Sequence, residues 1–323
     1  MPDTRLIIIT GISGAGKSNT AQNLARQYRM NGVRHVWMHE EIRRHPIRVG
    51  EFTAAPLETE ADFEINIRDY FRRWDRFIKR ILRSKSIYVM EGMLTENIIR
   101  YFYPGNYPEE KILAFYDELF DRLAPVCPMP VLLYRPNLVE TLEAMFRLRG
   151  DWWQNLILHG SDWDRYKAAH GLEGDQGVYT MWERYQALSK VIVQRYPGLK
   201  MIIDTSAMNW NSYIEQITLA LGLKYYPPVA VPVREPQQYC GRYEVDVGGQ
   251  TEAIDVCYDG TRLYVKSWWP MMPLLPLGGS RFEFASFPIK LSFRKNSVGQ
   301  VEAVDVTGIY DWEIVGTTMQ KVA

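Results

Sequence analysis

A glycine-rich segment near the start of the chain reads Gly11-Ile12-Ser13-Gly14-Ala15-Gly16-Lys17-Ser18. Small residues let the backbone curl so that successive N–H groups face inward, which suits a chain of phosphates. A lysine at this point reaches the terminal phosphates, and the serine after it offers a hydroxyl to Mg²⁺. The pattern therefore predicts a nucleotide phosphate site, with contacts expected from Gly11, Ser13, Gly14, Ala15, Gly16, Lys17, Ser18 and Asn19.

The residues on either side of this segment support the same interpretation. The run Leu6-Ile7-Ile8-Ile9 precedes it and predicts a strand that is buried on both faces. Apolar residues at helical spacing follow it, at Ala21, Leu24, Ala25 and Tyr28. Strand, loop and helix thus follow one another in the order that a phosphate-binding loop requires, and ATP with Mg²⁺ is the expected ligand.

Strand-like and helix-like segments alternate through the first two thirds of the chain. Apolar runs predict further strands at 33–38, 86–90, 131–134 and 199–203, and helical periodicity predicts helices from about residue 60 to 82, at 109–123, at 138–146, up to about 195 and at 213–221. Residues 150–176 are rich in Gly, Asp and Trp and are expected to be irregular. Alternation of this kind predicts an α/β domain with a parallel sheet and helices on both faces.

The composition changes after residue 224. Pro227, Pro228, Pro232 and Pro236 lie within ten residues and indicate an extended linker over 225–238. Beyond it, apolar and polar residues alternate with a period of two, as in Tyr243-Val245-Val247, and Gly-Gly and Asp-Gly pairs separate the runs. We therefore expect an α/β domain with the glycine-rich loop at 1–224 and a small antiparallel β-barrel-like domain at 239–323.

The overall composition excludes several classes of protein. The 323 residues include 38 basic and 38 acidic side chains, which argues against a nucleic-acid binder that acts through bulk charge. No run of about eighteen apolar residues and no signal-peptide layout is visible. Three widely separated cysteines form no CxxC pair, so we expect a reduced, cytoplasmic chain without a membrane span or a zinc site.

The glycine-rich loop and its flanking elements resemble P-loop NTPases, and residues 1–223 resemble the nucleoside and nucleotide kinase group, which includes thymidylate and deoxynucleoside kinases. The resemblance implies an ATP- and Mg²⁺-dependent kinase. It implies that Glu40 or Glu41, after the second strand, takes the proton of the acceptor hydroxyl; a solvated acidic start of a helix is the alternative. It also implies that Glu91 holds Mg²⁺ together with Ser18.

Two further points of the resemblance concern arginine. Many members of the group have an arginine directly after the carboxylate of the third strand, whereas this chain has Gly92. In these kinases, arginines of a lid close over the phosphates, and Arg147 and Arg149 match that place in the sequence. A basic helix end that interacts with the helix dipole is the alternative for this pair.

Residues 239–323 resemble the small β domain that follows some serine-hydrolase-like proteins. The matching segments are Gly241-Arg242-Tyr243, the DGTRLYVK stretch, Leu275-Pro276-Leu277 and the FRKNSVGQVEAV hairpin. No catalytic residue is implied by this resemblance.

The sequence thus favours a kinase that phosphorylates a hydroxyl or a phosphate of a small molecule, with a nucleoside or nucleotide as the first choice of acceptor. Another hydroxylated metabolite or an antibiotic is the second choice. A regulatory ATPase and a nucleic-acid end kinase that uses the Arg68–Arg83 face stay as alternatives from other classes. Arg100 and the five histidines carry no motif, and the oligomeric state, including a homo-oligomer, is left open.

Overall fold

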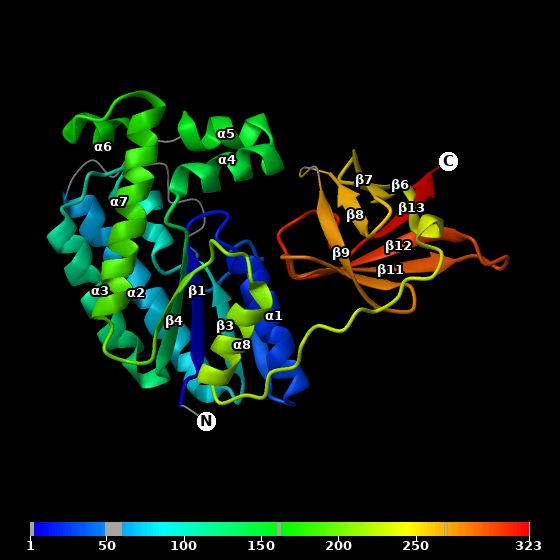
Figure 1. Ribbon diagram of the computed structural model, residues 1–323, viewed down its shortest axis with the longest axis horizontal. Helices are drawn as coiled ribbons and strands as arrows, with labels where there is room; N and C mark the ends of the chain where they lie inside the picture. Colours follow the sequence, from blue (N-terminus) through cyan, green and yellow to red (C-terminus); the bar gives the residue numbers. More distant parts are fainter. Residues whose placement is uncertain (1–2, 49–59, 160–162, 268, 270, 323) are drawn as a thin grey trace. The chain divides into compact units, whose positions relative to one another are not determined.

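A computed structural model describes residues 3–48, 60–159, 163–267, 269 and 271–322. The chain divides into two compact units (Figure 1). The larger comprises Met1–Glu40, Arg44–Arg147 and Asp151–Tyr226, and the smaller comprises Glu41–Arg43, Leu148–Gly150 and Pro227–Ala323. No helix in the described ranges is both long enough and apolar enough to cross a membrane.

The larger unit is built on a parallel sheet of five strands. In chain order these are β1 (Leu6–Gly11), β2 (His35–Met38), β3 (Ile87–Glu91), β4 (Pro128–Tyr134) and β5 (Met201–Asp204), and they lie in the order β2-β3-β1-β4-β5. Every residue of β1 is buried, as expected for a central strand covered on both faces. The predicted parallel α/β fold is confirmed.

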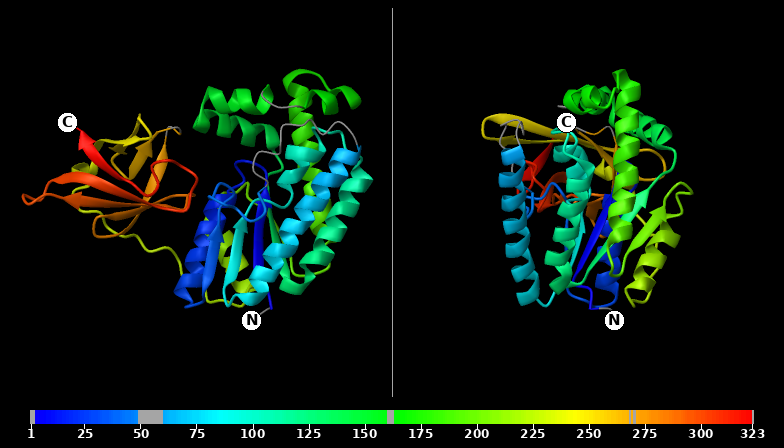
Figure 2. Two further views of the ribbon diagram at one scale, coloured as in Figure 1. Left: turned by 180° about the vertical axis from the view of Figure 1, so that it is seen from behind. Right: turned by 90° about the vertical axis from the view of Figure 1, so that its left-hand side faces the viewer.

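Helices cover both faces of this sheet (Figures 1 and 2). On one face lie α1 (Lys17–Met30) and α8 (Trp210–Ala220); on the other lie α2 (Glu60–Arg83), α3 (Glu109–Leu123) and α7 (Gly174–Arg195). Three shorter helices, α4 (Leu138–Arg149), α5 (Asp151–Leu158) and α6 (Asp164–Ala169), lie toward the carboxyl ends of the strands. Short turns of helix are η1 (Ile98–Phe102), η2 (Ala124–Val126) and η3 (Pro236–Tyr239).

The expectation of an irregular stretch at 150–176 is wrong for most of its described residues. They form α5, α6 and the first residues of α7, and only 160–162 lie outside the described part. The helices form because their aromatic residues find partners that the local sequence does not reveal: Trp153 is buried beside Phe146, and the ring of Tyr166 stacks at 4.4 Å on that of Tyr103. Tertiary packing overrides the weak helical propensity of Gly and Asp here.

The smaller unit contains a closed antiparallel barrel, which confirms the predicted class. Its strands are β6 (Gly241–Val247), β7 (Gln250–Tyr258), β8 (Leu263–Lys266), β9 (Met272–Gly278), β10 (Arg281–Phe284), β11 (Ile289–Lys295), β12 (Val301–Gly308) and β13 (Thr318–Val322). They follow one another in the order β10-β11-β12-β13-β6-β7-β8-β9, and β9 pairs again with β10. Closure removes the exposed edges that an open sheet would present, and side chains such as Tyr243, Phe282 and Phe284 fill the interior.

Candidate phosphate-binding site

The loop between β1 and α1 has a backbone that only glycine tolerates at two positions. Gly14 has φ +84°, and a Cβ atom there would lie 2.6 Å from Cγ of Met145 in α4. Gly16 has φ +92°, and a Cβ there would lie 2.3 Å from the ring of Trp210 in α8. Left-handed backbone is strained for any residue with a side chain. The glycines therefore allow α4 and α8 to pack directly against the loop.

Lys17 and Ser18 form the first turn of α1, and both side chains contact groups from other elements. Lys17 is 9% exposed; its Nζ donates to the carbonyl of Ile12 at 3.3 Å and lies 4.0 Å from Oε1 of Glu96. The Ser18 hydroxyl donates to Oε1 of Glu91 at 3.1 Å. The amino end of α1 adds the positive end of a helix dipole at the same place.

Glu91 ends β3 and lies at the centre of the site, where it is 1% exposed. Its Oε2 accepts from the backbone N–H of Glu40 at 3.3 Å and lies 3.4 Å from Nε2 of the buried His39. The end of β3, the first turn of α1 and the two residues that follow β2 therefore meet around one carboxylate, at the edge of the sheet where parallel α/β folds bind ligands. The structure brings Lys17, Ser18, Glu91 and Glu40 together.

The side chain of Glu40 is held by an arginine from another element. Oε2 of Glu40 accepts from Arg100, in η1, at 3.0 Å. Gly92 has φ +71°, and a Cβ there would lie 3.1 Å from the same Oε2 atom. A residue with a side chain at position 92 would therefore crowd Glu40, and the cation beside the Glu40 carboxylate is Arg100, eight residues further along the chain.

A second buried carboxylate, Glu96, lies behind Lys17. Glu96 is 6% exposed, and its oxygens accept from the Thr10 hydroxyl at 3.1 and 3.0 Å and from the backbone N–H of Leu94 at 3.1 Å. The Thr10 and Thr95 hydroxyls are 2.7 Å apart. Burial raises the pKa of the Glu96 carboxyl above its usual range, and the charge of Lys17 opposes this rise.

The remaining predicted residues lie elsewhere. Glu41 and Arg149 belong to the smaller compact unit. Arg147 is exposed in the last turn of α4 and makes no hydrogen bond or ion pair with any described residue. Asn19 is exposed on α1. The roles predicted for these four residues stay predictions.

Sequence reasoning missed or set aside three residues of this cluster: Glu96, Arg100 and His39. One local signal was available for Glu96. Thr95, Glu96 and Asn97 are three consecutive polar residues within the otherwise largely apolar stretch from Met90 to Phe102, and all three are buried. A buried polar group needs a partner, so such a run indicates a polar network. His39 directly precedes Glu40 after the second strand, so its position places it at the same edge of the sheet, whereas no pattern in the sequence links Arg100 to the loop.

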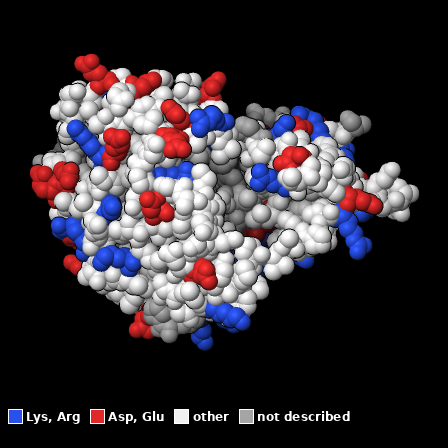
Figure 3. All heavy atoms as spheres, viewed as in Figure 1, with Lys and Arg blue, Asp and Glu red and all other residues white. Residues whose placement is uncertain are grey.

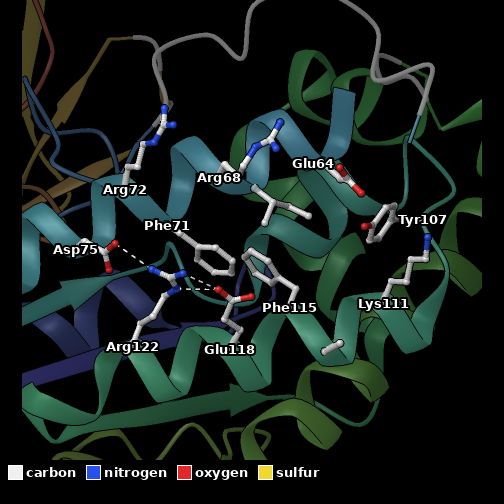
Figure 4. Close-up of a pocket in the computed structure, with 12 residues that line it drawn as sticks. Glu64, Arg68, Phe71, Arg72, Asp75, Tyr107, Lys111, Phe115, Glu118 and Arg122 are labelled. Carbon is white, nitrogen blue, oxygen red and sulfur yellow. Dashed lines mark hydrogen bonds and ion pairs between the residues drawn. The ribbon is translucent and has the colours of Figure 1, made fainter. Parts of the chain in front are cut away.

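A groove of about 630 Å³ lies between α2 and α3 (Figure 4). Basic and acidic side chains share it. Arg122 bonds to Asp75 at 2.9 Å and to Glu118 at 2.6 Å, and its guanidinium lies 4.5 Å from the centre of the Phe71 ring. Because Arg122 is paired with two carboxylates and Glu64 also lines the groove, its charge is mixed, which fits the solvated-face interpretation of α2 better than a phosphate site.

Charge is also mixed on the surface as a whole. Figure 3 shows acidic and basic side chains interspersed over the displayed face of the larger unit. A shallow hollow at the end of α2 is lined by Arg76, Lys79, Arg80, Arg83, Ser84 and Tyr88. Cations at this end of a helix offset the negative pole of its dipole, which accounts for the basic cluster without a ligand.

The donors at the loop suit a hard cation. The Ser18 hydroxyl and the Glu91 carboxylate are both oxygen donors, and Mg²⁺ is commonly held by one or two protein oxygens together with substrate phosphates and water. Within the described ranges, no group of three or more His, Cys, Asp or Glu side chains is arranged to hold a metal ion by itself. The residues present thus fit a magnesium ion that is bound jointly with a nucleotide.

Comparisons with known proteins identify similar solved structures at low similarity. No protein-family model and no curated protein matches the chain. A Bacillus subtilis protein, YorR, solved in complex with phosphorylated GDP, is 12% identical, with a TM-score of 0.38, and the match covers 67% of this chain and 95% of that one. A thymidylate kinase from Ehrlichia chaffeensis is 13% identical, also with a TM-score of 0.38, and the match covers 68% of this chain and all of that one.

Proposed function

We propose that this protein is an ATP- and Mg²⁺-dependent kinase that transfers the γ-phosphoryl group to a hydroxyl or phosphate of a small molecule, with a nucleoside or nucleotide as the favoured acceptor. The observation that carries the proposal is that Ser18, next to Lys17 in the first turn of α1, donates to the Glu91 carboxylate, and that the backbone N–H of Glu40 donates to the same carboxylate at the carboxyl edge of the sheet. The preference for a nucleoside or nucleotide rests on the resemblance of residues 1–223 to kinases of that group.

Lys17 and the N–H groups of the loop neutralise the phosphates of the nucleotide. Ser18 and Glu91 hold the Mg²⁺ ion, which, when bound, stabilises the negative charge that develops on the phosphates. Because Glu91 is buried and already accepts from the Ser18 hydroxyl, both donors need little movement to serve as ligands. Arg147 and Arg149 are the proposed arginines of the lid over the transferred group.

Glu40 orients the acceptor and receives its proton. In the transfer step, the acceptor oxygen forms a bond to the γ-phosphorus, and the bond from that phosphorus to the oxygen bridging the β- and γ-phosphates breaks, so ADP leaves. The proton of an acceptor hydroxyl passes to the Glu40 carboxylate. Arg100, at 3.0 Å, holds that carboxylate in place. Glu41 is the alternative base.

The test is mass spectrometry of a mixed pool of nucleosides, nucleotides, sugars and hydroxylated natural products. The pool is incubated with Mg-ATP and either the wild type or Lys17→Ala, and Lys79→Ala, which alters an exposed lysine on α2, serves as the matched control. We expect one compound to gain a phosphoryl group with the wild type and with Lys79→Ala, but not with Lys17→Ala.

Two other outcomes would contradict the proposal. Conversion of ATP to ADP without any phosphorylated acceptor would favour the regulatory ATPase. Phosphorylation of oligonucleotide ends, with binding that weakens steeply as salt rises, would favour the nucleic-acid end kinase.

A further inference from the structure

We propose that Glu96 is the buried counter-ion that holds Lys17 before nucleotide binds, and that Glu96 takes up one proton from solvent when the nucleotide phosphates draw Lys17 away. Glu96 is thus a positioning residue for Lys17, and nucleotide binding is coupled to proton uptake. This inference rests on the proposed function in one respect, since it takes the nucleotide as the ligand of Lys17.

The contacts of Glu96 describe a carboxylate that is fixed in place. The Thr10 hydroxyl and the Leu94 N–H donate to it, and Lys17 is the cation nearest to it at 4.0 Å. Thr10 is itself anchored in β1 and contacts Thr95. Each of these groups donates and thereby stabilises the charged carboxylate, which opposes the rise in the pKa of Glu96 that burial produces.

The charge balance changes when Lys17 moves. A second cation that acts on Glu96 is Arg100, which lowers the pKa of Glu96 but is already bonded to Glu40 at 3.0 Å. The charge of the Glu40 carboxylate raises that pKa. Among the described residues, Tyr70 on α2, Tyr116 on α3 and Tyr185 on α7 also act on Glu96, and burial raises the pKa of each, so they stay neutral.

A buried carboxylate that loses its countercharge is expected to bind a proton. Leaving an isolated charge out of water costs several kcal/mol, and protonation removes that cost. The proton comes from the buffer, and Glu96 becomes a neutral carboxylic acid. Because Glu96 takes up a proton when nucleotide binds, the affinity for nucleotide falls as pH rises. The fall reaches up to tenfold per pH unit in the range where Glu96 is charged in the free protein and neutral in the bound protein.

The experiment is isothermal titration of the full chain with the magnesium complex of a non-hydrolysable ATP analogue at pH 7, in several buffers of different ionisation enthalpy. The slope of the observed enthalpy against the ionisation enthalpy of the buffer counts the protons exchanged. The wild type is expected to take up about one proton more than Glu96→Gln. Glu118→Gln, an exposed carboxylate on α3, is the matched control and keeps the slope of the wild type.

A second measurement does not depend on a variant that folds. The infrared difference spectrum of the wild type with and without nucleotide should gain the carbonyl band of a protonated buried carboxyl group, and where Glu96→Gln folds the band should be absent from its spectrum.

Equal slopes for the wild type and Glu96→Gln, or no such band in the wild type, would overturn the inference while leaving the proposed function intact. Failure of the wild type to bind the nucleotide at all would overturn both.

Discussion

The Ser18 hydroxyl donates to Oε1 of Glu91 across 3.1 Å, and this bond joins the first turn of α1 to the end of β3. The contact arises because β1 and β3 are neighbours in the sheet, with Ile9 paired to Glu91. The loop after β1 therefore starts beside the carboxylate that ends β3. This juxtaposition is the basis for the proposed metal site.

We predict that Ser18→Ala and Glu91→Gln each raise the Mg²⁺ concentration needed for half-maximal phosphoryl transfer, by roughly tenfold or more, because each removes one oxygen donor. In the double variant, this Mg²⁺ concentration should rise by less than the product of the two single factors, since both residues serve the same ion. The measurement is initial rate against Mg²⁺ concentration. Ser297→Ala, which alters an exposed serine of the barrel, is the control. If the effects of Ser18→Ala and Glu91→Gln on the Mg²⁺ requirement multiply fully in the double variant, the two residues do not share an ion.

The assignment of Glu40 as base predicts that Glu40→Gln lowers kcat by about 10²–10⁴-fold for a hydroxyl acceptor, with little change in the KM for ATP. Arg100→Ala should lower kcat less, because it loosens the carboxylate without removing it. Steady-state kinetics with both substrates varied separates these effects. Glu110→Gln changes an exposed glutamate at the start of α3 and is the control. A larger loss in Glu41→Gln than in Glu40→Gln would identify Glu41 as the base.

A comparison of Gly92→Ala with Gly32→Ala separates the effect of backbone strain from the effect of crowding Glu40. Gly92 has φ +71° and Gly32 has φ +69°, but only at Gly92 would a Cβ approach another residue, Oε2 of Glu40 at 3.1 Å. Each alanine variant should destabilise the fold by about 1 kcal/mol, as measured by urea unfolding, because each places a side chain in left-handed backbone. Gly92→Ala alone should also lower the transfer rate. Equal rates in the two variants would show that crowding of Glu40 has no effect.

The buried environment of His45 predicts that the folded protein loses stability in acid. Its Nδ1 accepts from the backbone N–H groups of Ile47 at 3.2 Å and Arg48 at 2.9 Å. Burial, and then the charge of Arg48, lowers the pKa of His45 from 6.5 to about 4. The pKa of His45 is lower in the folded protein than in the unfolded chain, so neutral His45 stabilises the fold. This stabilisation is complete above pH 6.5 and is lost as pH falls toward 4. It amounts to about 3 kcal/mol.

Urea unfolding at pH 8 and pH 5 measures this effect. Between these values the wild type should lose about 2 kcal/mol more stability than His45→Asn. His159→Asn, which alters an exposed histidine, should behave like the wild type. The same loss of stability in His45→Asn would place the acid sensitivity in another group.

Much of the fold could be predicted from the sequence because its signals are local. The spacing of apolar residues in α1, α2 and α3 reflects the helical period, and the alternation in β6, β7 and β11 reflects the period of a strand. The loop could be predicted because glycines at 14 and 16 meet a backbone requirement within a few residues. The helices α5 and α6 escaped prediction because their stability comes from distant aromatic partners such as Tyr103.

The sequence by itself determined the phosphate-binding loop, the parallel α/β class and the presence of a second, all-β unit, because each depends on neighbours along the chain. Only the tertiary structure decided which polar groups lie beside Lys17, Glu91 and Glu40. Glu96, Arg100 and His39 reach the site from elements that the order β2-β3-β1 places side by side. No local pattern records that order, since strand neighbours follow from how the whole sheet packs between its helices.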